Sequence, residues 1–123
     1  MAVPILKQGD VLIASIQAAL SDQDLVQLRD ELAVRIGSFR SRGVIIDLTA
    51  LDVLDSFATR TLRSIAYAAR LRGANTMVVG IQPDVAFAMV QLGLSLEDVA
   101  TGLDLEEGLE ELNRTLKQRG RRA

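Results

Sequence analysis

The chain has 123 residues, a length typical of one domain, and 49% of them are hydrophobic. It contains no histidine, no cysteine and no tryptophan. A His-dependent catalytic triad, a thiolate nucleophile and a His/Cys zinc site are therefore excluded, and with them most common enzyme chemistries. The lack of cysteine fits a reducing compartment, and the cytoplasm is the expected location.

The charge is unevenly distributed along the chain. The formal net charge is −2, but four of the 14 basic residues lie in the last seven positions, which leaves 10 bases against 16 acids in the rest. An acidic body argues against nucleic acid as a partner, and no apolar run is long enough to cross a membrane. We expect one domain over residues 1–118 and a disordered basic tail over 119–123.

The N-terminal half predicts a hairpin, a helix and a buried strand. Ile5–Lys7 and Val11–Ser15 flank a turn with Gly9 and read as an antiparallel hairpin. Ser21 is the expected cap of a helix whose apolar residues repeat at helical spacing until Gly43. The next strand, Val44–Leu48, is apolar except at Asp47, which indicates a central position covered on both faces.

The C-terminal half continues the alternation of helix and strand. A helix is predicted from about Phe57 to Arg72, and a buried strand follows over Thr76–Ile81. Pro83 opens a short helix with an expected inner stripe of Val85, Ala88, Met89 and Leu92. An extended piece over 96–99 precedes a last helix with leucines at 105, 109, 112 and 116. The predicted fold class is α/β, with a mixed, mostly parallel sheet entered by the antiparallel hairpin.

Functional residues of such sheets gather in loops beyond the carboxyl ends of the strands, and here Ser56 follows one of them. A hydroxyl at a helix N-terminus faces free backbone N–H groups, so a phosphate added there is electrostatically favourable. The alternative is that Ser56 is only an N-cap, and position alone favours the cap. Asp47, Asp52 and Asp55 also permit a magnesium site, which we disfavour because Asp47 suits local backbone capping.

The order of elements, together with Asp55-Ser56-Phe57, resembles the STAS family of sulphate-transporter cytoplasmic domains and anti-sigma-factor antagonists. Within that family, the strand before Leu54-Asp55-Ser56 and the later segment 80–86 with Leu92-Gly93 are similar to the scaffold subunits of the bacterial stressosome. Freestanding antagonists usually have Ser or Thr and then Gly soon after the serine. Here Phe57, Ala58 and Thr59 follow, which favours the scaffold type. Larger paralogues carry an additional N-terminal sensory domain, so this chain is expected to be the short version.

The resemblance implies a non-catalytic protein without a cofactor. Such a protein co-assembles with larger STAS paralogues, holds a serine/threonine switch kinase and releases it when phosphorylated. Carried over to this sequence, the phosphorylated residue is Ser56, with Thr59 as a weaker candidate. Partner contacts are expected at Asp55, Leu54, Phe57 and Arg60. Candidates for exposed assembly contacts are Leu51, Val53 and Leu54, and the alternative is that these three cap the core. The alternative functions are an anti-anti-sigma factor that binds an anti-sigma kinase and a module that binds an anionic ligand or nucleotide.

Overall fold

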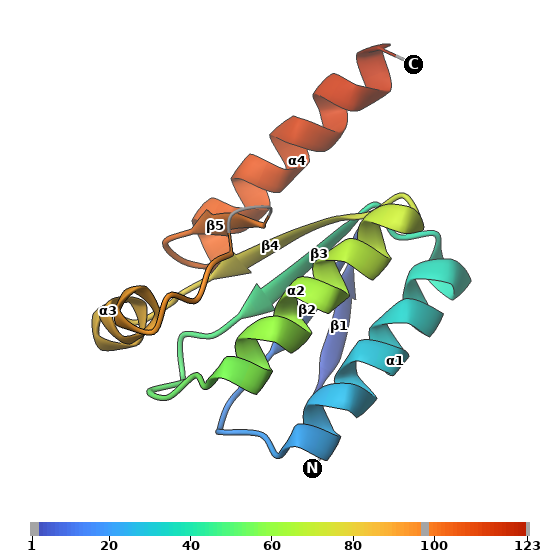
Figure 1. Cartoon of the computed structure of the whole chain (residues 1–123). Coiled ribbons are helices and arrows are strands. Elements are labelled where there is room, and N and C mark those ends of the chain that lie inside the picture. The colour runs from blue at the N-terminus through green and yellow to red at the C-terminus, as the bar shows by residue number, and fades with distance from the viewer. Residues whose placement is uncertain (1–2, 97–98, 123) are drawn as a thin grey trace.

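The computed structural model describes residues 3–96 and 99–122 and forms one five-stranded sheet flanked by helices (Figure 1). The strands lie in chain order, and only the first pair is antiparallel, which confirms the predicted fold class. The elements are β1 (Ile5–Gln8), β2 (Val11–Ser15), α1 (Asp22–Phe39), β3 (Gly43–Asp47), α2 (Ser56–Leu71), β4 (Asn75–Val79), α3 (Pro83–Gln91), β5 (Ala100–Gly102) and α4 (Leu105–Arg122).

Local sequence signals account for the first elements. Gly9 has φ of 59° in the turn of the β1–β2 hairpin, a backbone conformation that favours glycine. Ser21 caps α1 in a capping box with Asp24, as the sequence predicted for the cap. The helix ends earlier than Gly43, because Arg40 adopts a left-handed conformation and Gly43 already belongs to β3.

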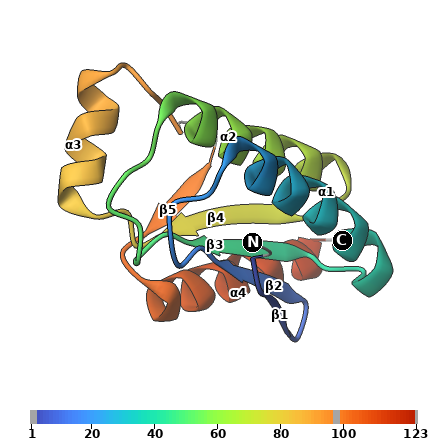
Figure 2. The ribbon, with the colours of Figure 1, turned by 90° about the horizontal axis from the view of Figure 1, so that it is seen from below.

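The core consists of two layers, one on each face of the sheet. α1 and α2 cover one face (Figure 2). The buried side chains in the cluster with these helices include Leu12, Val44, Ile46 and Val78. α4 covers the other face with Leu112 and Leu116, which pack in one cluster with strand residues Val11, Ile13, Ile45, Met77 and Val79. β3 is therefore buried on both sides, as the uniform apolar strand predicted.

The predictions for α3 and for the segment after it were wrong in part. Ala88 and Leu92 are exposed rather than part of the inner stripe of α3, because the helix ends at Gln91 and packs through Val85 and Met89. At the ends of the extended piece expected over 96–99, neither residue 96 nor residue 99 belongs to a strand, and positions 97 and 98 lie outside the described residues. The strand before α4 is β5, at residues 100–102.

α4 runs from Leu105 to Arg122 and so includes positions 119–122 of the segment expected as a basic tail, while residue 123 lies outside the described residues. Lysine, arginine and glutamine are good helix formers, and positive charge suits a helix C-terminus. Across residues 3–96 and 99–122, we find no helix that is both long enough and apolar enough to cross a membrane.

Candidate functional site

The candidate site is the loop between β3 and α2, at the carboxyl edge of the sheet. Immediately after β3, one carboxylate oxygen of Asp47 accepts hydrogen bonds from the Thr49 N–H at 2.9 Å and the Thr49 hydroxyl at 2.6 Å. The interpretation of Asp47 as a local backbone cap is therefore confirmed. In the described part of the chain, no group of three or more Asp, Glu, His or Cys side chains gathers as a metal ligand set would.

Asp55, and not Ser56, is the N-cap of α2. Its side-chain carboxylate accepts a hydrogen bond from the Ala58 N–H at 2.8 Å, while its backbone carbonyl accepts from the Thr59 N–H at 3.0 Å. Ser56 is the first residue of the helix. The interpretation of Ser56 as the cap was wrong, because the carboxylate of the preceding residue already satisfies the amide that a cap at this terminus serves.

The hydroxyl of Ser56 is left without a structural role. The side chain is half-buried, and its hydroxyl has no hydrogen-bond partner among the described residues. The amides of Ser56 and Phe57 lie ahead of the first helical hydrogen bond, which Thr59 makes, so they are among the unsatisfied donors of the helix start. A free hydroxyl thus lies beside free N–H groups.

Thr59, the weaker candidate for phosphorylation, lies in a different environment. Its side chain is 0% exposed, and its hydroxyl donates a hydrogen bond to the backbone carbonyl of Asp55 at 3.0 Å. A kinase reaches this hydroxyl only if the first turn of α2 opens. The geometry therefore argues against Thr59 and leaves Ser56, which is only half-buried, as the less buried of the two.

The expected contact residues divide between core and surface. Leu51 and Leu54 are buried, so the prediction that they form exposed contacts was wrong: they close the core beneath the loop. Val53 lies between them and is 64% exposed. Asp55 and Arg60 are exposed, and Phe57 is half-buried against the core. A pocket of about 60 Å³, lined mainly by apolar side chains such as Leu20, Leu25 and Val53, opens beside Asp55.

The loop between β4 and α3 contacts the loop between β3 and α2, and the sequence did not predict this contact. The side-chain amide of Gln82 donates to the backbone carbonyl of Thr49 at 2.8 Å. Gly80 has φ of 76° and lies against the same loop. An added Cβ there would clash with the Thr49 hydroxyl and would stand 3.1 Å from the Asp47 carboxylate. Gly80-Ile81-Gln82-Pro83 stood out in the sequence, but its contact with a loop 33 residues away did not.

Comparisons with known proteins agree with this geometry. A model of the STAS domain matches residues 2–108. A solved serine-to-glutamate variant of RsbS from Moorella thermoacetica is 37% identical, with a TM-score of 0.81, and the match covers 94% of this chain and 97% of that one. A chain in a solved structure of the stressosome, which is described there as a signal integration and transduction hub, is 35% identical, with a TM-score of 0.76. That match covers 92% of this chain and 98% of the other.

A curated relative is longer than this chain. The RsbT co-antagonist protein RsbRA of Bacillus subtilis is 25% identical over 108 residues, which are 88% of this chain but 39% of RsbRA. The chain thus spans about two fifths of the length of RsbRA. The family model matches most of the chain and the RsbS relative aligns over almost its whole length, so this protein belongs to the STAS domain family, as its sequence motifs indicated.

Proposed function

We propose that this protein is the scaffold and antagonist subunit of a stressosome-type signalling complex, which holds a serine/threonine switch kinase and releases it when Ser56 is phosphorylated. The observation that carries this proposal is the state of the Ser56 hydroxyl. The Ser56 side chain is only half-buried and its hydroxyl has no partner among the described residues, while Asp55 alone supplies the helix cap. The residue is thus available for modification without loss of a structural hydrogen bond.

The helix start favours the phosphorylated form. A phosphoserine carries a charge of about −1.5 to −2 and three acceptor oxygens. The amides of Ser56 and Phe57 precede the first helical hydrogen bond, and the positive end of the helix dipole lies at the same place. The modified chain should therefore remain folded.

The same charge disfavours a partner packed against this surface. The exposed Val53 side chain lies three residues before Ser56, and Arg60 lies one turn after it. A partner that covers Val53 and a neutral serine hydroxyl would have to desolvate a dianion after phosphorylation. Release of the partner then needs no rearrangement of the fold.

The relatives support the class of function. RsbS matches over almost the full length of both chains, and a second match comes from a stressosome structure. RsbRA and RsbRC of Bacillus subtilis are named as co-antagonists of RsbT. On this basis the proposed partners are larger RsbR-like paralogues, further copies of this chain and the switch kinase. The anti-anti-sigma alternative differs in needing no paralogue for kinase binding.

The deciding experiment is phosphorylation of the purified chain by candidate switch kinases with ATP, followed by peptide mapping. We expect one phosphate on Ser56 and none in Ser56→Ala. The matched control is Ser64→Ala, because Ser64 is exposed on the same helix and should leave phosphate uptake unchanged. Phosphate on another residue, or equal uptake by Ser56→Ala, would contradict the assignment.

Sedimentation tests the scaffold role separately from the modification. The chain is measured alone and mixed with a larger RsbR-like paralogue. We expect a large complex in the mixture. A strict monomer in both samples would remove the scaffold function and favour the anti-anti-sigma alternative.

A further inference from the structure

The outward side of α2 is strongly basic. The sequence of α2 has no Asp or Glu between residues 56 and 71, whereas three arginines follow one stripe of the helix. Positions 60, 63, 67 and 70 recur every three or four residues and therefore share a side. Their side chains are exposed, and we call this surface the α2 basic face: Arg60, Arg63, Tyr67 and Arg70.

The stability of α2 itself does not explain this face. Cations are favourable near a helix C-terminus, which accounts for Arg70, but unfavourable near the N-terminus, where Arg60 lies. Neither Arg60 nor Arg63 has a partner among the described residues. Arginine and tyrosine are both enriched at protein interfaces.

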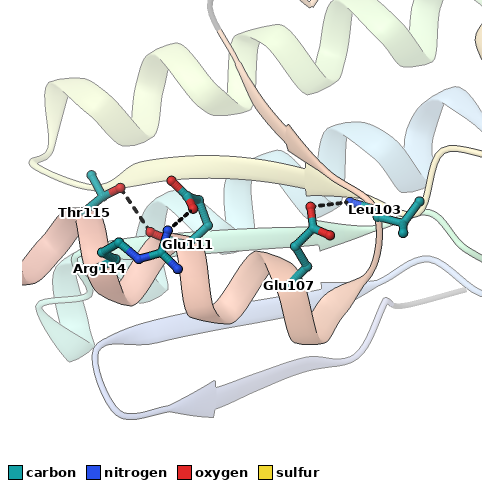
Figure 3. Close-up of polar contacts among 5 residues, drawn as sticks. All are labelled: Leu103, Glu107, Glu111, Arg114 and Thr115. Carbon is teal, nitrogen blue, oxygen red and sulfur yellow. Dashed lines mark hydrogen bonds and ion pairs between the residues drawn. The ribbon is translucent and has the colours of Figure 1, made fainter.

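The opposite side of the molecule carries the opposite charge. The first half of α4 exposes four glutamates, which we call the α4 acidic face: Glu106, Glu107, Glu110 and Glu111. Figure 3 shows part of this surface, where Glu107 accepts from the Leu103 N–H at 3.4 Å and Glu111 pairs with Arg114 at 2.6 Å. Glu106 and Glu110 have no ion-pair partner among the described residues.

The two faces cannot meet within one chain. α2 packs on one side of the sheet and α4 on the other, so the sheet separates them (Figure 2). Complementary patches on opposite sides of one molecule fit a heterologous, head-to-tail contact between copies, which builds rings or larger assemblies. The exposed Leu71 and Leu103 lie at the margins of the two faces and add apolar area.

We infer that the α2 basic face of one copy docks on the α4 acidic face of a second copy. This inference deepens the proposed scaffold function by naming the surfaces, but it does not depend on Ser56 as the phosphorylated residue. Single exposed ion pairs are weak and screened by salt. The contact should therefore be weak, should depend on several ion pairs together and should be lost at high ionic strength.

Site-specific cross-linking tests the contact, because the chain has no cysteine of its own. Ser64→Cys and Leu103→Cys add one thiol beside each face and leave all the charges in place. The two variants are mixed at low salt with a short bis-maleimide, and cross-linked peptides are identified by mass spectrometry. We expect 64–103 links that fall about tenfold in high salt.

The matched control replaces Ser64→Cys by Ser38→Cys, since Ser38 is also exposed and lies on another helix, at the C-terminal end of α1. Equal yields from positions 38 and 64, or a majority of 64–64 links, would overturn the inference.

A charge exchange tests whether the opposite charges hold the two faces together. Arg60→Glu with Arg63→Glu in the Ser64→Cys chain should abolish the link, and Glu106→Lys with Glu110→Lys in the Leu103→Cys chain should restore it. Failure of the exchange to restore the link would also overturn the inference.

No kinase or phosphate is present in this experiment. Loss of the 64–103 link with normal phosphorylation of Ser56 would reject the docking surfaces alone. A normal link with no phosphate on Ser56 would reject the modification site alone.

Discussion

The side-chain amide of Gln82 donates a hydrogen bond to the backbone carbonyl of Thr49 at 2.8 Å and so joins the loop before α3 to the loop before α2. Gln82 is the N-cap residue of α3, yet its side chain makes no cap hydrogen bond to that helix. The Gln82 amide instead positions the loop that leads to Ser56. A hydrogen bond therefore links the start of α3 to the loop that carries Ser56 at its end.

We predict that Gln82→Met loosens the loop before α2 without unfolding the protein. Methionine keeps the length of the side chain but lacks the donor, and loss of one partly exposed hydrogen bond costs about 0.5–1 kcal/mol. Hydrogen exchange should accelerate at the amides of residues 50–54. The control is Gln91→Met, at an exposed position of the same helix. Unchanged exchange in Gln82→Met would show that Gln82 does not hold the loop.

Gly80→Ala should be more damaging than a comparable change at Gly73. Both glycines have positive φ, 76° and 88°, so each alanine suffers a backbone penalty of about 1–2 kcal/mol. A Cβ at Gly80 also clashes with Thr49, whereas a Cβ at Gly73 meets nothing within 4 Å. Denaturant unfolding of both variants measures the difference. Equal losses of stability would mean that the turn at Thr49 moves aside freely.

The cap assignment predicts opposite outcomes for two neighbouring residues. Asp55→Ala should lower the free energy of unfolding by about 1 kcal/mol, because the Ala58 N–H loses its acceptor. Asp55→Asn keeps an acceptor and should lose less. Ser56→Ala should stay within about 0.5 kcal/mol of the parent, because the Ser56 hydroxyl has no partner among the described residues. A larger loss in Ser56→Ala than in Asp55→Ala would reverse the assignment.

Negative charge at Ser56 should weaken kinase binding while stability stays nearly constant. Ser56→Asp adds one charge beside Asp55, which is favourable at a solvated helix start but unfavourable in a desolvated interface. A carboxylate has less charge than phosphate, so the effect should be partial. Calorimetric affinity for the kinase should fall from parent to Ser56→Asp to the phosphorylated chain.

The control for this series is Ser64→Asp, which adds the same charge two turns along α2 at an exposed position. It should bind the kinase as the parent does. Equal affinity of the parent, Ser56→Asp and the phosphorylated chain would show that phosphorylation is not the release signal. A collapse in thermal stability of Ser56→Asp would mean that the serine is structural.

The sequence by itself determined the layers of the fold. Three signals depend on residues near one another in the chain: the uniform apolar character of β3, the glycine turn after β1 and the cap at Ser21. The structure confirms all three. The position of Ser56 at a helix start beyond a strand was also predictable. Short-range backbone preferences and the burial of apolar side chains are sufficient reasons for these features.

The tertiary structure decided which neighbouring residue performs which task. Asp55 and Ser56 are both good N-caps, and the path of the loop selected the aspartate. Leu54 and Val53 are both aliphatic, yet one is buried and the other is exposed. The Gln82–Thr49 hydrogen bond joins residues 33 positions apart. The opposite charges of α2 and α4 cannot pair within one chain because the sheet lies between the two helices. Such relationships depend on the packing of distant segments, which local periodicity does not encode.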